Sequence, residues 1–496
     1  MERAEYSSTF RGGQTVEKAA KGNLIDTCAN VIGTHPDIIL RQERLWSLLP
    51  EHLKDYVRLA TRRFIALEEE KELLPVVIEK IFVEDVMEMI DFDNFTGVTN
   101  TFLLSVHKRI DLEQLRSLSI VNNRKVNNNT IASFLRGCIN LQHLNLKGCL
   151  NLKNEAFPEK VVKQLPELRY LNISFTQVSG KAIALVYEHC KKLSTLKLAG
   201  CKFADSLTAY KIFPQPSEAM TNLKLRHCVI NQNHLQYILG VFPNLETFDY
   251  SSSGLRSIRP FYSTSHPSKL RKLNLSNCPS LDLTKPMELR KVLQTHSHLE
   301  HIYLTGARIS LEFAISDESI RNFKTLFLPE LAYPTDLLPV ILEKATNLTY
   351  LDLSHSYLRF HPDDYAEQLV VDVPNLRTLS LEDTKVVDGS ARLISQIHTL
   401  HSLFLRGTAI SAVGVREIVY ACPWLEELDV TSCRAIEIRD RRSLLSNLRK
   451  QFWGLLEEAK KHEKVLDPED GHWYKLERFT SGDEKREGLV KIQYVD

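Results

Sequence analysis

Histidine and cysteine are the residues of this chain with the widest chemical range, and their spacing indicates whether they could bind a metal or catalyse a reaction. The sequence contains 17 histidines and nine cysteines. No two cysteines are spaced as CxxC, and no HExxH, GxSxG, GxxxxGK[ST] or GxGxxG motif occurs. The pairs His296/His298 and His398/His401 lie near expected strand starts or helix ends, where capping and surface roles predominate. We therefore expect no catalytic residue, no metal and no cofactor, and a protein that is not an enzyme.

The elements that position these residues come from a repeated LxxLxL pattern. Thirteen units recur every 24 to 29 residues, and each one reads as a short alternating strand, a turn and an amphipathic helix. The units start at residues 115, 141, 168, 193, 220, 245, 270, 299, 323, 348, 376, 400 and 425. No unit can bury its own apolar side chains, so the units must stack. The pattern predicts an α/β leucine-rich-repeat solenoid, a right-handed horseshoe with a parallel inner sheet and outer helices.

Eight of the nine cysteines recur at fixed positions in this pattern. Five of them follow their unit's start by eight residues, and three end the helix of the preceding unit. The five are Cys149, Cys201, Cys228, Cys278 and Cys433, and the three are Cys138, Cys190 and Cys422. We expect these thiols to be buried, free of disulfide bonds, and to serve as small apolar groups.

Composition and charge limit the classes of partner. The 496 residues include 63 basic and 62 acidic side chains, for a formal charge of +1, which argues against a general binder of phosphate backbones. No apolar run has the length of a signal peptide or the ~20 residues needed to cross a bilayer. The sequence therefore predicts an intracellular protein, cytoplasmic or nuclear, with no membrane partner.

Outside the repeats we expect a disordered N-terminus over residues 1–18, a helical segment over 19–110 and a C-terminal helical cap and tail over 439–496. The repeat domain is expected to occupy 111–438. In the N-terminal segment, Leu24, Cys28 and Ile32 recur every four residues and so share one stripe of a helix. Further along, Pro50 can begin a second helix that displays Leu53.

Together, these features resemble known substrate receptors of ubiquitin ligases. Repeats with LxxLxLxxC and a helix-ending CxxL are similar to cysteine-containing leucine-rich repeats of such receptors. The stripe in residues 23–32 and the LP element in 48–57 resemble the elongin-C-binding box and cullin-contact element of the Zyg-eleven/Zer-one group. The resemblance implies that Leu24, Cys28 and Ile32 bind elongin C and that Leu49, Pro50 and Leu53 face a cullin.

Alternation along each strand predicts which side chains face away from the core. The second and fourth residues after a unit's first leucine should point into the concave side of the solenoid. Aromatic residues at these positions are candidates for anchoring a protein substrate, namely Tyr303, Phe327, Tyr350 and Phe404. The alternative is that the chain's own irregular segments, 255–268 or 311–336, or its C-terminal tail cover them. Lys197, Lys224 and Lys272 face the same way and could meet an acidic peptide or RNA.

The leading hypothesis is a substrate-recognition subunit of a cullin–RING ubiquitin ligase, with elongin C on the N-terminal helices and the substrate on the concave face. One alternative is an F-box-type receptor that uses a Skp-type adaptor, because WSLLPEHLKDYVRLATRR also has an LP start. Another is a leucine-rich-repeat interaction scaffold with no link to a ligase. A third is an RNA-binding repeat protein, whose affinity would fall steeply with salt.

Overall fold

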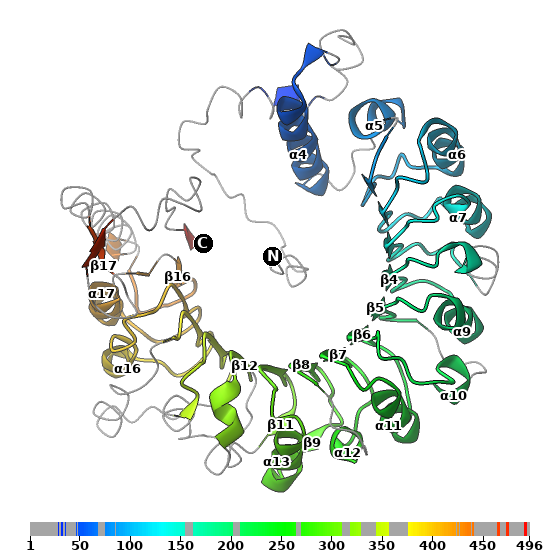
Figure 1. Ribbon diagram of the computed structural model, residues 1–496. Helices are drawn as coiled ribbons and strands as arrows, with labels where there is room; N and C mark the ends of the chain where they lie inside the picture. Colours follow the sequence, from blue (N-terminus) through cyan, green and yellow to red (C-terminus); the bar gives the residue numbers. More distant parts are fainter. Residues whose placement is uncertain are drawn as a thin grey trace. The chain divides into compact units, whose positions relative to one another are not determined.

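A computed structural model describes most of the repeats and parts of both terminal segments. The described residues are 28, 31–32, 35, 46, 48–67, 75–84, 86–153, 162–201, 209–263, 269–309, 318–328, 344–356, 375–422, 424–425, 427–437, 439–440, 464–466, 473–475 and 491–493. The chain forms two compact units, residues 1–224 and 225–496. Each unit is a leucine-rich-repeat solenoid in which parallel strands lie on one side and helices on the other (Figure 1).

The first unit begins with helices and continues with parallel strands that alternate with helices. Its strands pair in the order β1-β2-β3-β4-β5-β6, all parallel. The elements are α4 (Glu51–Leu67), α5 (Pro75–Phe82), β1 (Met89–Asp91), α6 (Asn100–Arg109), β2 (Ser117–Ser119), α7 (Asn128–Leu135), β3 (His143–Asn145), η1 (Val162–Gln164), β4 (Tyr170–Asn172), α9 (Gly180–His189), β5 (Thr195–Lys197), α10 (Ala209–Ile212) and β6 (Asn222–Lys224).

The second unit continues the same alternation. Its strands pair in parallel in the order β7-β8-β10-β12-β13-β14-β15-β16. The elements up to the last repeat are α11 (Gln232–Val241), β7 (Thr247–Asp249), α12 (Arg259–Tyr262), β8 (Lys272–Asn274), β9 (Asp282–Leu283), α13 (Pro286–Thr295), β10 (His301–Tyr303), β11 (Arg308–Ile309), η2 (Glu318–Asn322), β12 (Thr325–Phe327), β13 (Tyr350–Asp352), β14 (Thr378–Ser380), α16 (Asp388–Ile394), β15 (Ser402–Phe404), α17 (Ala412–Ala421) and β16 (Glu427–Asp429).

The thirteen predicted repeat units are confirmed, since each has a three-residue strand that begins two residues after the unit's start. The central residue of every such strand is buried, as Leu118 and Leu428 illustrate at the two ends of the array. Polar caps start several of the helices: the Asn127 side chain accepts from the backbone N–H of Thr130 at 3.0 Å, and Asn231 accepts from that of His234 at 2.8 Å. The alternating pattern and the caps together determine the local structure.

The parallel sheet starts earlier than the expected boundary at residue 111. Strand β1 pairs with β2, and helix α6 follows it as in every later unit. Here Met87, Ile90 and Phe92 occupy the positions that leucines hold elsewhere, and Ile90 and Phe92 are fully buried. The interpretation of 19–110 as a helical segment outside the repeats was wrong from about residue 87 onward, because a search for leucines overlooks apolar residues of other types.

A left-handed turn residue confirms the register of this additional repeat. The residue seven positions after the unit's start has positive φ in each unit where the structure describes it, including Asn94 after Met87. Asparagine and glycine adopt this conformation most readily. At Gly407, φ is +70° and an added Cβ would lie 1.9 Å from Oδ1 of Asp383, so close approach of the neighbouring turn also requires glycine there.

All eight repeat cysteines are buried and free, as predicted. Their thiols donate to backbone carbonyls, often those of the preceding repeat: Cys149 Sγ lies 2.9 Å from the Ile120 oxygen and Cys433 Sγ 3.1 Å from that of Leu405. Burial raises the pKa of Cys149 to about 11 and that of Cys190 to about 12. These thiols therefore stay protonated and link adjacent repeats.

The C-terminal segment differs from the expected helical cap where it is described. Strands β17 (Lys464–Leu466) and β18 (Trp473–Lys475) pair antiparallel, and β19 (Lys491–Gln493) pairs in parallel with β16. Residues 441–463, where the helix was expected, lie outside the described residues. The expected N-terminal disorder over 1–18 lies outside them too.

Candidate functional site

Side chains that face away from the core form two rows across the strands of the second unit. The first residue of each strand forms one row and the third residue forms the other, because the second residue points into the core. We call these the leading row and the trailing row. From β7 to β16 the leading row reads Thr247, Lys272, His301, Thr325, Tyr350, Thr378, Ser402 and Glu427, and the trailing row reads Asp249, Asn274, Tyr303, Phe327, Asp352, Ser380, Phe404 and Asp429.

Three of the four predicted substrate-binding aromatics lie side by side in these rows. The ring centroids of Tyr303 and Phe327 are 5.7 Å apart, and those of Phe327 and Tyr350 are 6.2 Å apart and nearly parallel. All three side chains are half-buried. At the β8 end, the ammonium of Lys272 lies 5.3 Å from the Tyr303 ring. Tyr303, Phe327 and Tyr350 form what we call the aromatic row, a continuous apolar strip three strands wide.

The fourth predicted aromatic, Phe404, does not adjoin this group in the register. Asp352 and Ser380 stand between Phe327 and Phe404 in the trailing row. Phe404 is also half-buried, and its neighbour on the next strand is Asp429. Sequence alternation therefore predicted its direction, while the register separates it from the other rings.

Carboxyl groups lie beyond the aromatic row, on β13 and β16 and directly after β14. Burial raises the pKa of Asp352 above its ordinary value, although hydrogen bonds from the Ser354 hydroxyl and N–H oppose the shift. The pKa of Glu382, which follows β14, is raised by burial and then by the like charges of Asp429 and Asp352. The pKa of Tyr350 is raised by burial and by nearby Asp352. This end of the face therefore concentrates negative charge beside aromatic rings.

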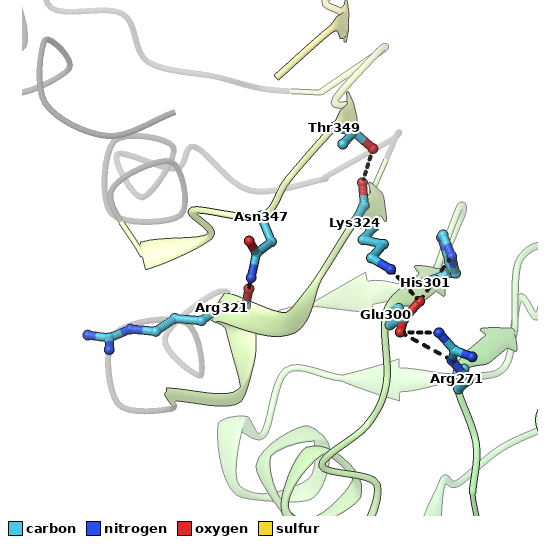
Figure 2. A network of polar contacts seen from close by, with 7 residues as sticks. All are labelled: Arg271, Glu300, His301, Arg321, Lys324, Asn347 and Thr349. Carbon is cyan, nitrogen blue, oxygen red and sulfur yellow. Dashed lines mark hydrogen bonds and ion pairs between the residues drawn. The ribbon is translucent and has the colours of Figure 1, made fainter. Parts of the chain in front are cut away.

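A charged cleft of about 610 Å³ lies at the edge where β8, β10 and β12 begin. Glu300 lies at its centre, and Figure 2 shows Arg271 and Lys324 converging on it. Arg271 Nη2 lies 2.6 Å from Glu300 Oε1, and Lys324 Nζ lies 3.1 Å from Oε2. Burial alone would raise the pKa of Glu300, but its ion pairs with these two cations lower it below its ordinary value.

This ion-pair network was missed by the sequence reasoning. Arg271, Glu300 and Lys324 each occupy the position directly after the first apolar residue of their unit, which was not counted among the outward-facing positions. The alternation of charge at that one position in successive units was the signal. Asn347 also lines this cleft, and its side-chain amide donates to the Arg321 backbone oxygen at 2.9 Å (Figure 2). These contacts tie successive repeats together.

In the first unit the corresponding rows carry polar and basic side chains. His143 and Tyr170 stack with centroids 3.9 Å apart, and Lys197 Nζ lies 5.1 Å from the Tyr170 ring. Burial lowers the pKa of His143, and the charge of Lys197 lowers it further. Lys224 extends this row on β6, next to Lys197 in the register.

The predicted adaptor-binding residues are only partly described. Cys28 is helical and exposed, and Ile32 is helical and half-buried, whereas Leu24 lies outside the described residues. Leu49 and Leu53 are half-buried and Pro50 is exposed. Helix α4 begins directly after Pro50, as the sequence predicted.

Helix α4 attaches to α5 and to the first repeat strand through two arginines. Arg62 Nη1 lies 2.8 Å from the carboxylate of Asp91 on β1, and the Arg62 guanidinium lies 5.1 Å from the ring of Phe82 on α5. Arg58 Nε donates to the backbone oxygen of Ile81 at 2.9 Å. On other faces of this segment Leu48 and Leu59 are 76% and 47% exposed. The first unit thus presents apolar side chains near its N-terminal helix.

The histidine pairs have structural contacts. His296 is buried with Nε2 2.8 Å from the Phe261 oxygen, and His398 Nδ1 lies 2.9 Å from the Ala421 oxygen. Among the residues that the structure describes, no three His, Cys, Asp or Glu side chains lie close enough to hold a metal ion. Within the same residues, no helix has the length and apolarity that crossing a membrane would require.

The chain is similar to known proteins in structure and not in sequence. No family model matches the chain, and no curated protein matches it in sequence. Among solved structures it is similar to an internalin (inlF) of Listeria monocytogenes, at 16% identity and a TM-score of 0.39 over 70% of this chain and 87% of that one. It is also similar to a structure of the Rad7 and Elc1 complex in yeast, at 16% identity and a TM-score of 0.41 over 86% of each chain.

A third similar structure is the leucine-rich-repeat ectodomain of the receptor kinase GASSHO1/SCHENGEN3 from Arabidopsis thaliana. It shares 15% identity and a TM-score of 0.41 over 69% of this chain and 47% of that one. The strand register and the repeated turn show independently that this chain has the leucine-rich-repeat fold. In its second unit, a sheet face carries an aromatic row beside a group of carboxylates.

Proposed function

We propose that this chain binds a protein partner on the sheet face of its second unit and presents that partner to a cullin–RING ubiquitin ligase. The observation that carries the first part is the aromatic row on β10, β12 and β13. Aromatic residues ringed by polar groups are the commonest anchors of protein interfaces. Here the polar surround consists of Lys272 at one end and Asp352 at the other.

The link to a ligase rests on the N-terminal segment. Its motif resembles an elongin-C-binding box, and the exposure of Cys28 and Val31 supports the availability of a helical surface there. Leu48 and Pro50 are both exposed within the LP element. In this proposal the helical stripe with Cys28 and Ile32 binds elongin C. Leu49, Pro50 and the half-buried Leu53, which lies in the first turn of α4, face a cullin.

The chain itself performs no chemistry in this mechanism. Holding a substrate close to a ubiquitin-charged enzyme raises its effective concentration and so accelerates transfer. The chain's contributions are affinity for the partner and affinity for the adaptor.

Affinity purification of the tagged chain from its own cells tests the ligase link. We compare wild type with a Leu24→Asp, Cys28→Asp double variant, and use Val413→Asp as the control because Val413 is exposed on α17 in the second unit. We expect elongin C and a cullin with wild type and with the control, and neither with the double variant. Skp-type adaptors in their place would indicate an F-box-type receptor, and retention of neither adaptor would leave an interaction scaffold with no ligase.

A further inference from the structure

Asparagine and aspartate perform the same structural task at the end of many strands. In the trailing row their Oδ1 accepts the backbone N–H two residues later and so closes the turn. The distances are 3.1 Å for Asn172 and Ser174, 3.0 Å for Asn274 and Ser276, 2.9 Å for Asp352 and Ser354, and 2.7 Å for Asp429 and Thr431. An amide oxygen and a carboxylate oxygen serve equally well, so this turn does not require a negative charge.

The charge at Asp352 is therefore additional to what the fold needs. The residue is only 6% exposed, and burial raises its pKa, which means that the ionised form is disfavoured in the folded protein. Asparagine, as found at Asn172 and Asn274, would close the same turn without this cost. Hydrogen bonds from Ser354 and Tyr350 offset only part of the cost of burying this charge, so a bound cation nearby would stabilise the ionised form further.

One carboxylate, Glu382, interacts with two others, Asp352 and Asp429. It interacts with these two as like charges, and with Arg406 and His355 as opposite charges. Arg406 and His355 are both exposed, whereas Asp352 is buried and the other two carboxylates are half-buried. Like charges held together at low exposure gain more from an added cation than isolated surface carboxylates do.

The aromatic row adjoins this group directly. Phe327 is the register neighbour of Asp352, and Tyr350 lies on the same strand as Asp352. At the opposite end of the row, Lys272 lies 5.3 Å from the ring of Tyr303, so this ring already accepts a cation. A ligand that spans the two features needs a positive group next to apolar groups.

We propose that the partner is held through an extended segment in which an Arg or Lys side chain lies between apolar residues. The cation pairs with Glu382, whose like-charged neighbours Asp352 and Asp429 add to the attraction. The apolar side chains lie on Tyr303, Phe327 and Tyr350. This inference rests on the proposed protein-binding function and specifies its ligand. Charge complementarity favours this occupant over nucleic acid or an acidic peptide, since the carboxylates repel phosphates and carboxylates.

The test is an array of random dodecapeptides that are acetylated at the N-terminus and amidated at the C-terminus, so that side chains supply every cation. Wild type is compared with an Asp352→Asn, Glu382→Gln variant, in which the asparagine closes the turn as Asn274 does. We expect the peptides that bind wild type to be enriched in Arg or Lys next to apolar residues, and the variant to lose at least tenfold in affinity for them. A bound set without basic residues, equal binding by the variant, or no bound peptide would each overturn the inference.

A second measurement separates charge from shape. In the tightest-binding peptide, each Arg is replaced by citrulline, which has a similar size and no charge. We expect at least a tenfold loss with wild type and little further loss with the Asp352→Asn, Glu382→Gln variant. Equal affinity of the two peptides for wild type would contradict the inference.

Failure of this inference differs from failure of the proposed function. If Phe327→Ala abolishes binding while neither the carboxylate variant nor citrulline changes it, the face binds protein but not through a cation. Capture of elongin C is measured on the same variants and depends on the N-terminal segment alone. Its absence would remove the ligase role and leave the peptide result intact.

Discussion

The sheet faces of the two units share one geometry and differ in chemistry. From β2 to β6 the trailing row of the first unit reads Ser119, Asn145, Asn172, Lys197 and Lys224. From β10 to β16 that of the second unit reads Tyr303, Phe327, Asp352, Ser380, Phe404 and Asp429. The trailing positions from β2 to β6 are thus polar and basic, whereas those from β10 to β16 are mostly aromatic and acidic.

This contrast separates the demands of the fold from those of binding. Both units bury the central residue of each strand, use a left-handed turn residue and bond cysteine thiols to backbone carbonyls. Both accept asparagine or aspartate in the trailing row. What remains, the rings and the surplus carboxylates, is free to serve a function, because a fold does not by itself determine function.

The largest expected effect concerns the cysteines, whose burial the two units share. We expect iodoacetamide to modify the exposed Cys28 first and the repeat cysteines at least about a hundredfold more slowly. The reason is that the thiolate is the reactive form and burial disfavours the thiolate. Burial raises the pKa of Cys138 to about 12 in the first unit and that of Cys422 to about 12 in the second. Mass spectrometry of timed samples gives the rates.

Cys28→Ser serves as the control for this measurement, since it should remove only the fast phase. Faster modification of Cys149 than of Cys433 would show that the first unit opens more readily than the second. Rapid modification of both would contradict the burial on which the common core depends.

The next effect is on partner binding. Phe327 is flanked by Tyr303 and Tyr350, so Phe327→Ala should weaken partner binding by about thirtyfold, the typical cost of removing a central aromatic anchor. The matched change in the first unit, Tyr170→Ala, removes a stacked ring of the other face and should leave affinity unchanged. Calorimetry on the two variants measures this. Equal losses would mean that the partner uses both faces.

A smaller effect, on the free energy of unfolding, is expected when the Asp of the second unit is replaced by Asn and the matching Asn of the first unit by Asp. Asp352→Asn should stabilise the second unit, and Asn172→Asp should destabilise the first by on the order of 1 kcal/mol, because each position is buried and only the carboxylate carries a charge there. The turn hydrogen bond is expected to survive in both variants. Urea unfolding of each variant gives the free energies.

The dependence on pH checks the cause of this effect. Burial raises the pKa of Asp352 in the folded state above the ordinary value of 3.8. Below pH 3.8 the carboxyl is therefore neutral and does not destabilise the folded protein. The destabilisation appears as pH rises above that value and is complete above the raised pKa of the folded state. The advantage of Asp352→Asn should therefore grow over this window. An advantage that is constant with pH would indicate a packing effect instead.

The smallest effect concerns the charged cleft. Glu300→Gln removes the shared partner of Arg271 and Lys324 and should lower the thermal midpoint slightly, with a smaller difference at high salt. Glu167→Gln in the first unit removes a single exposed pair, in which Lys192 Nζ lies 2.6 Å from Oε1. We expect a smaller change there. Equal changes would show that the network adds nothing beyond one pair.

The sequence predicted the repeated elements well because their signal is local. Strand positions, buried leucines and eight buried cysteines all follow from a pattern that each unit repeats. The repeat that starts at Met87 was missed because methionine, isoleucine and phenylalanine replace its leucines, although Asn94 supplies the left-handed turn. The candidate site was predicted in part, since the directions of its aromatic side chains follow from alternation.

What the sequence by itself determined is the period, the buried face and the set of side chains that point away from the core, because alternation and turn chemistry act within one repeat. What only the tertiary structure decided is which of these side chains meet. Phe327 contacts Tyr303 and Tyr350 while Phe404 lies apart from them along the trailing row, and Glu382 interacts with Asp352 and Asp429. These neighbours come from different repeats, so the register of stacked strands and the burial of each carboxyl set their contacts and charges.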